Sequence, residues 1–171
     1  MHPSNTNDWT YCTLYISPID DDEAECLFQI QQLVQDLEDP DDKSALSFFN
    51  HAPIPQILID NCYKIGESVE LENENMTGYR FLHQYTKEQW GTCFDAVDVT
   101  FCEDSNGNIH YEFKCLEGVP LGWLEKVSAA FPDVYFDMEC MNELELFDSY
   151  SVSYHDGVQI DFETHKKQKN K

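Results

Sequence analysis

Basic residues are scarce in this chain, in which 10 Lys and Arg stand against 33 Asp and Glu among 171 residues, a formal net charge of −23. Four of the ten cations lie in residues 166–171, so the body at 1–165 holds six cations and all 33 acids, a formal charge of −27. Such a field repels nucleic acid and anionic membranes and attracts basic surfaces at long range. We therefore expect a basic protein partner and no direct binding to nucleic acid or membrane.

Several other features are also lacking. The seven cysteines never come closer than nine residues apart, so no CxxC-type zinc pair exists, and the seven glycines are spread singly, without a phosphate-binding loop. No stretch approaches 18 apolar residues, and residues 1–10 do not resemble a signal peptide. We expect a soluble protein of the cytoplasm with reduced thiols, no metal or cofactor, and no small-molecule ligand.

Catalytic motifs are equally hard to find. The six histidines never fall at HxxxH spacing, and none flanks a cysteine in a nucleophile motif. With so many carboxylates, neighbouring acids such as Asp95 and Asp98 arise by chance and carry little evidence for catalysis. We predict that the chain is not an enzyme, with a metal-dependent hydrolase as an open alternative.

Apolar residues make up 42% and aromatics 13%, which is typical of a globular domain. Alternation predicts a strand over 9–17, and apolar residues at 3-4-3 spacing predict a helix over about 22–38. We interpret residues 43–92 as an insertion. We expect irregular structure in its first part, where Pro53 and Pro55 exclude a central strand. Within it we expect a short helix near 55–63, an exposed acidic loop or edge element over 66–76, and a helix over 77–90.

The second half has a clearer pattern. Alternating residues on both sides of Asn106-Gly107 predict a β-hairpin, and Pro120 marks the start of a helix that ends at Pro132. A strand follows over 134–140, then a second hairpin around Asp156-Gly157. The order predicts one α+β domain over 1–165: a ferredoxin-like split β-α-β antiparallel sheet with helices on one face and an extra C-terminal hairpin. Residues 166–171 are expected to form a basic disordered tail.

Two groups of acids are candidate partner-binding residues. If the alternating apolar residues pack on the helices, the other sheet face carries a lattice of carboxylates with Lys114 as its one cation. A second group lies at and just after the C-terminus of the helix over 22–38, where the helix dipole disfavours negative charge. Either group could instead be a solvated surface. The sheet group is Asp98, Glu112, Asp137, Glu139, Asp161 and Glu163, and the second group is Asp36, Glu38, Asp39, Asp41 and Asp42.

Residues 90–96 read WGTCFDA, and residues 131–136 read FPDVYF after the Pro-led helix. With Asp8-Trp9 near the start and the segments at 49–50 and 53–55, these motifs resemble the YubB-like family of phages and conjugative plasmids. The sequence departs from the family pattern at Cys93-Phe94, where Lys-Trp is usual. The resemblance implies a ferredoxin-like C-terminal domain and an origin in a mobile element, but no established activity.

These observations favour a non-enzymatic acidic accessory protein of a phage or plasmid. It would bind a host defence protein that handles nucleic acid, such as a CRISPR effector or a restriction enzyme, and act as an anti-CRISPR or anti-restriction inhibitor. Its carboxylates would stand in for phosphates and block nucleic-acid binding. The alternative from the same residues is an interaction or regulatory module without mimicry, whose acidity serves solubility alone.

Overall fold

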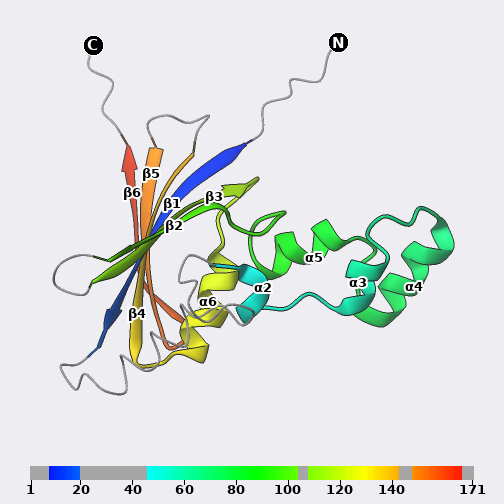
Figure 1. The fold of residues 1–171 in the computed structure, drawn as a ribbon, viewed down its shortest axis with the longest axis horizontal. Helices are drawn as coiled ribbons and strands as arrows, with labels where there is room; N and C mark the ends of the chain where they lie inside the picture. Colours follow the sequence, from blue (N-terminus) through cyan, green and yellow to red (C-terminus); the bar gives the residue numbers. More distant parts are fainter. Residues whose placement is uncertain (1–7, 20–45, 104–107, 143–147, 167–171) are drawn as a thin grey trace, which may run out of the picture.

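The computed structural model describes residues 8–19, 46–103, 108–142 and 148–166, and its centre is a six-stranded sheet in the order β2-β3-β1-β4-β5-β6 (Figure 1). Every neighbouring pair of strands is antiparallel. The chain is therefore an α+β protein. The strands are β1 (Trp9–Pro18), β2 (Val97–Glu103), β3 (Ile109–Leu116), β4 (Val134–Asn142), β5 (Asp148–His155) and β6 (Val158–Lys166).

The helices lie to one side of this sheet. Figure 1 shows α6 (Leu121–Ala130) and α2 (Phe48–His51) beside the sheet, while α5 (Leu82–Gln89), α3 (Gln56–Asp60) and α4 (Glu67–Thr77) extend away from it. We call α3, α4 and α5 the helical arm. The predicted insertion over 43–92 therefore forms mainly this arm, and the opposite face of the sheet has no described helix over it.

The core lies between the sheet and α6, as the alternating pattern predicted. Phe48 of α2 sits at its centre, with its ring centroid 4.8 Å from that of Trp123 on α6 and 5.9 Å from that of Phe113 on β3. Leu14 of β1 and Phe136 of β4 are fully buried in the same cluster. Burying such aromatic and aliphatic side chains stabilises each by about 1.5–3 kcal/mol.

Most predicted strands and the Pro-led helix are confirmed. The strand over 9–17, both strands of the 97–114 hairpin and the strand over 134–140 match β1, β2, β3 and β4, and the helix after Pro120 matches α6. The helix over 22–38, the Asn106-Gly107 turn and most of the basic tail lie outside the described residues.

The prediction for residues 66–76 was wrong, because this segment forms the helix α4 rather than an exposed acidic loop or an edge element. A glycine stands at each end of α4. Gly66 precedes the first turn. Gly78, with φ 84°, ends the helix by donating its N–H to Glu74 O. Its surface is polar on nearly every side, so no apolar stripe marked it in the sequence. The helix expected over 77–90 begins only at Leu82, because α4 occupies the chain up to Thr77 and ends at Gly78. The Pro-flanked segment expected to be irregular also contains the one-turn helix α2.

The last strand also departs from expectation. Val158, Ile160 and Phe162 of β6 were expected to face the helices together, but they are 59%, 53% and 48% exposed. β6 is the edge of the sheet, and a register shift between Ser153 and Tyr154 interrupts the alternation opposite it.

A buried tryptophan joins the helical arm to the sheet domain. The Trp90 side chain is 2% exposed, and its Nε1 donates to Ala52 O at 2.8 Å. Gly91 follows with φ 94° and lies so close to the chain after β3 that a Cβ there would be 2.2 Å from Val119 O. The segment at 90–96 therefore has a structural role at this junction.

Candidate protein-binding face

The sheet face opposite the helices carries the predicted carboxylates. We call it the open face, defined by the residues that point to that side on all six strands. The strand register aligns three glutamates in one row, and all three are exposed. We call it the Glu row, and it runs in strand order through Thr100, Glu112, Thr13, Glu139, Ser151 and Glu163.

The Glu row has a regular spacing. Glutamates stand on β3, β4 and β6, with a threonine or serine on each strand between or beside them. Because neighbouring strands lie about 4.8 Å apart, successive glutamates are about 9.6 Å apart across the sheet. At this backbone spacing each glutamate can pair with a separate cation.

A second row of the open face adds two aspartates. Asp137 on β4 and Asp161 on β6 lie on either side of Ser153, and Ser153 Oγ donates a hydrogen bond to Asp137 Oδ1. Asp137 is half-buried and Asp161 is exposed. Five of the six sheet carboxylates predicted from alternation thus lie within two adjacent rows of one face.

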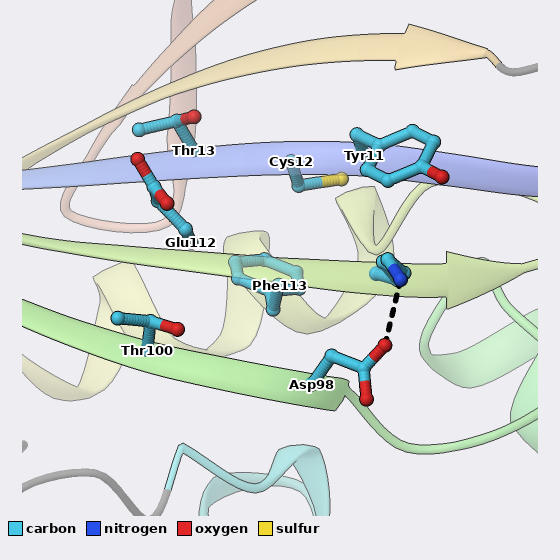
Figure 2. A pocket seen from close by; sticks show the side chains of 8 residues that line it. Tyr11, Cys12, Thr13, Asp98, Thr100, Glu112 and Phe113 are labelled. Atoms are coloured by element: carbon cyan, nitrogen blue, oxygen red, sulfur yellow. Dashed lines mark hydrogen bonds and ion pairs between the residues drawn. The ribbon is translucent and has the colours of Figure 1, made fainter.

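Asp98, the sixth, is placed differently. Its Oδ2 lies 2.7 Å from Lys114 Nζ, and that ammonium also lies 5.3 Å from the centroid of the Tyr11 ring. Asp98 has φ 53° and sits where the register of β2 against β3 shifts, beside a surface cavity of about 260 Å³ (Figure 2). In Figure 2 the dashed line that starts at Asp98 marks this ion pair.

Positive charge is otherwise nearly absent from the open face. Lys114 is the only Lys or Arg there among the described strand residues whose side chains are placed. Two histidines approach the Glu row: His110 Nε2 lies 4.0 Å from Glu112 Oε1, and His165 Nε2 lies 3.8 Å from Glu163 Oε2. They contribute positive charge only when their rings are protonated.

An exposed tyrosine lies among these carboxylates. Tyr15 on β1 is 43% exposed and pairs in register with Asp137 on one side and His110 on the other. The adjacent row places Glu112 and Glu139 on the two neighbouring strands. The Tyr15 ring also lies 5.4 Å from the His110 ring between centroids. An exposed aromatic ring with carboxylates on the neighbouring strands suits a guanidinium group, which stacks on rings and forms paired hydrogen bonds with carboxylates. Tyr15 was not among the residues predicted from the sequence, although the alternation of 9–17 already placed it on the polar side of its strand.

The remaining acidic residues considered in the sequence do not lie on the described part of the open face. The group Asp36, Glu38, Asp39, Asp41 and Asp42 lies outside the described residues. Asp95 accepts hydrogen bonds at 2.6 Å from both the Ser47 hydroxyl and the Phe48 N–H, so it holds the start of α2.

Within residues 8–19, 46–103, 108–142 and 148–166, no three His, Cys, Asp or Glu side chains group in a way that could hold a metal ion. No helix there is both long and apolar enough to cross a membrane.

Comparison with known proteins adds a fold relative but no function. No family model matches the chain, and no curated protein matches it. Among solved structures, the chain is similar to the crystal structure of the protein api92 from Yersinia pseudotuberculosis, described with the family model DUF1281. The match covers 95% of this chain and 99% of that one, with a TM-score of 0.57 and 8% sequence identity. At that identity the likeness shows a shared fold alone.

Proposed function

We propose that the open face binds a basic surface of a protein that handles nucleic acid and thereby competes with the nucleic acid. The observation that carries this proposal is the Glu row, in which three exposed glutamates stand on every second strand, about 9.6 Å apart from backbone to backbone. The nearby cation, Lys114, forms an ion pair with Asp98, so it is already engaged by a carboxylate outside the row. A groove that neutralises phosphates with Lys and Arg offers the matching charges.

The mechanism we propose is occupation of the groove. The strong negative field of the chain steers it toward a positive groove, and the carboxylates then pair with side chains that would otherwise hold phosphates. In this proposal the protein performs no chemical reaction on its target.

The biological setting is part of the same proposal. The strand order β2-β3-β1-β4, with α6 between β3 and β4, supports a ferredoxin-like assignment for this part of the sheet. We propose an accessory protein of a phage or plasmid, related to the YubB-like family, that acts in the host cytoplasm on a CRISPR effector or a restriction enzyme.

The test is competition in a mobility-shift assay. Purified protein is titrated into a panel of CRISPR effectors and restriction enzymes already bound to their own nucleic acids. We expect displacement from at least one target, weakening steeply between about 50 and 200 mM salt because the contacts are ionic. The triple variant Glu112→Gln/Glu139→Gln/Glu163→Gln should lose roughly tenfold or more in affinity, mainly through a slower association rate.

A matched variant separates the open face from net charge. Glu72, Glu88 and Glu125 are exposed on α4, α5 and α6, so changing these three to Gln removes the same charge elsewhere. This control should keep nearly full affinity. Neutralising the group at 36–42 in a third variant tests the other predicted acidic group. If the two Glu→Gln triples weaken binding equally, only the total charge matters and the open face is not the binding site.

The same variants report on the fold. Glutamates about 9.6 Å apart repel one another by only a few tenths of a kcal/mol in water. The open-face triple variant should therefore unfold at the same or a slightly higher denaturant concentration, and a loss of binding in it cannot be attributed to unfolding.

A further inference from the structure

The helical arm contains a cavity of about 430 Å³, formed by residues of α3, α4, α5 and the loops that connect them. This volume falls within the usual range for small-molecule sites, about 300–1,000 Å³. The arm extends away from the sheet in Figure 1, so this cavity is separate from the open face. No small-molecule ligand was expected from the sequence, in which the lining residues of this cavity are scattered over 58–94.

Part of the lining of the cavity is a chain of hydrogen bonds that includes two buried amides. Asn61 and Asn73 are 7% and 4% exposed, and Asn61 Nδ2 donates to Asn73 Oδ1 at 2.8 Å. Asn73 Nδ2 donates to Arg80 O at 3.0 Å, and Lys64 Nζ donates to Asn61 Oδ1 at 2.7 Å. Burying amides is costly unless they are hydrogen-bonded. This network therefore fixes the segment after α3 and the segment after α4, and it holds Lys64 at the cavity.

Hydrogen-bond donors for an anionic ligand also line the cavity. The Lys64 ammonium has three N–H donors and uses one for Asn61, which leaves two for a ligand. Arg80 also lines the cavity, and its Nε is oriented by Glu74 Oε2 at 2.8 Å. Two of the few cations of this chain therefore line one cavity, against a single lining carboxylate, Glu70.

Apolar and aromatic side chains also line the cavity. Leu58, Phe81 and Phe94 line it, and the Phe81 ring stacks with that of His83 at a centroid separation of 5.5 Å and an interplanar angle of 14°. Phe81 and Phe94 are 39% and 54% exposed, so they offer ring surface to a ligand.

We propose that this cavity binds a small molecule that combines an apolar ring with one acidic group, either a carboxylate or a phosphate ester. The ring lies against Phe81 and Phe94, and the acidic group accepts hydrogen bonds from Lys64 and Arg80. The ligand carries few charges because the strongly negative chain repels polyanions.

The experiment follows backbone amide shifts by NMR while four probes are added to the full chain. Benzoate and phenyl phosphate carry a ring with the two candidate acidic groups, benzamide is the neutral counterpart, and inorganic phosphate lacks the ring. We expect saturable shifts at the amides of 61–64 and 80–83 with benzoate or phenyl phosphate, with a Kd on the order of 1 mM for such small probes. Whichever acid binds more tightly identifies the group. Benzamide and inorganic phosphate should bind at least about tenfold more weakly.

Two lysine variants make the test specific. Lys64→Met keeps the aliphatic stem but removes the ammonium, and it should weaken binding of the preferred acid by about tenfold. Lys87→Met removes an exposed lysine of α5 that does not line the cavity, and it should leave the affinity unchanged. Equal binding of benzamide and the acids, an unaffected Lys64→Met variant, or no localised saturable shift with either acid would each overturn the proposal.

Discussion

Asp98 on β2 and Lys114 on β3 form an ion pair at 2.7 Å across the register shift of these two strands. The same ammonium lies 5.3 Å from the Tyr11 ring centroid, so it is held by a carboxylate and an aromatic face together. Asp98 therefore differs from the carboxylates of the Glu row in that its ion pair with a lysine joins two strands. The pair also shows, within this protein, how a cation can sit on the open face.

Removing that cation should strengthen binding to a basic partner. Lys114→Gln frees Asp98 and makes the open face more negative by one charge, so we expect the affinity for a hexa-arginine peptide to rise a few-fold through faster association. The free energy of unfolding should change by no more than about 1 kcal/mol, because the pair is partly exposed. Stopped-flow binding and denaturant unfolding measure the two effects. Lys87→Gln changes the net charge equally on the helical arm, and an identical rise in that variant would contradict a role for the open face.

Tyr15 should make the open face prefer arginine to lysine. Hexa-arginine should bind more tightly than hexa-lysine by roughly two- to fivefold, since a guanidinium on an exposed ring contributes about 0.5–1 kcal/mol. Tyr15→Ala should remove this preference while the dependence on salt stays, and Tyr15→Phe should restore it. Tyr11→Ala is the matched control on the same strand, because the Tyr11 ring already has Lys114 over it. Calorimetric titration measures both peptides, and equal affinities for the wild-type protein would refute the preference.

The strands that could be predicted from the sequence are those in which apolar and polar residues alternate regularly. Alternation placed Phe113 and Phe136 in the core and Glu112 and Glu139 on the opposite face, because a strand points successive side chains to opposite sides. The same rule failed at Ile160, where an edge position and a register shift expose apolar residues. Neither feature leaves a mark in the sequence of β6 itself.

The helical arm was harder to predict because local patterns did not define it. α4 is polar on nearly all sides, and its buried residue is an amide, Asn73, rather than an apolar side chain. Asn73 is satisfied by Asn61, twelve residues away and in another element, so only the folded arm reveals the pairing. The cavity beside these amides was unpredictable from sequence for the same reason.

The junction of arm and sheet should tolerate no side chain at Gly91. A Cβ there would lie 2.2 Å from Val119 O, and the φ of 94° is already unfavourable for other residues. Gly78 has a similar φ of 84°, but a Cβ at that position would have no atom within 4 Å, which makes it the matched control. Gly78→Ala should cost about 1–2 kcal/mol from the left-handed backbone alone, and Gly91→Ala should cost clearly more in chemical denaturation. Equal losses would mean that the chain after β3 moves aside at little cost.

The buried thiols should make stability fall in alkaline solution. Cys12 and Cys140 face each other across β1 and β4, with their Sγ atoms 3.1 Å apart. A hydrogen bond with Cys115, together with burial, raises the pKa of Cys12 well above its ordinary value, and burial does the same to the pKa of Cys140.

Because the folded pKa exceeds the unfolded one, the unfolded chain loses these protons first. Their contribution to stability is complete below about pH 8.5, the ordinary thiol pKa, and is lost progressively above it. Each thiol adds a slope of at most about 1.4 kcal/mol per pH unit to the free energy of unfolding. Urea unfolding from pH 7 to pH 10 should therefore show a shallower decline in the free energy of unfolding for the Cys12→Ala/Cys140→Ala variant than for the wild type.

In parallel, an alkylating reagent should label the exposed Cys62 quickly in the native protein, and all seven cysteines after denaturation without reductant. Identical pH slopes in the two proteins, or fewer than seven labelled thiols, would show that these cysteines are not buried neutral thiols.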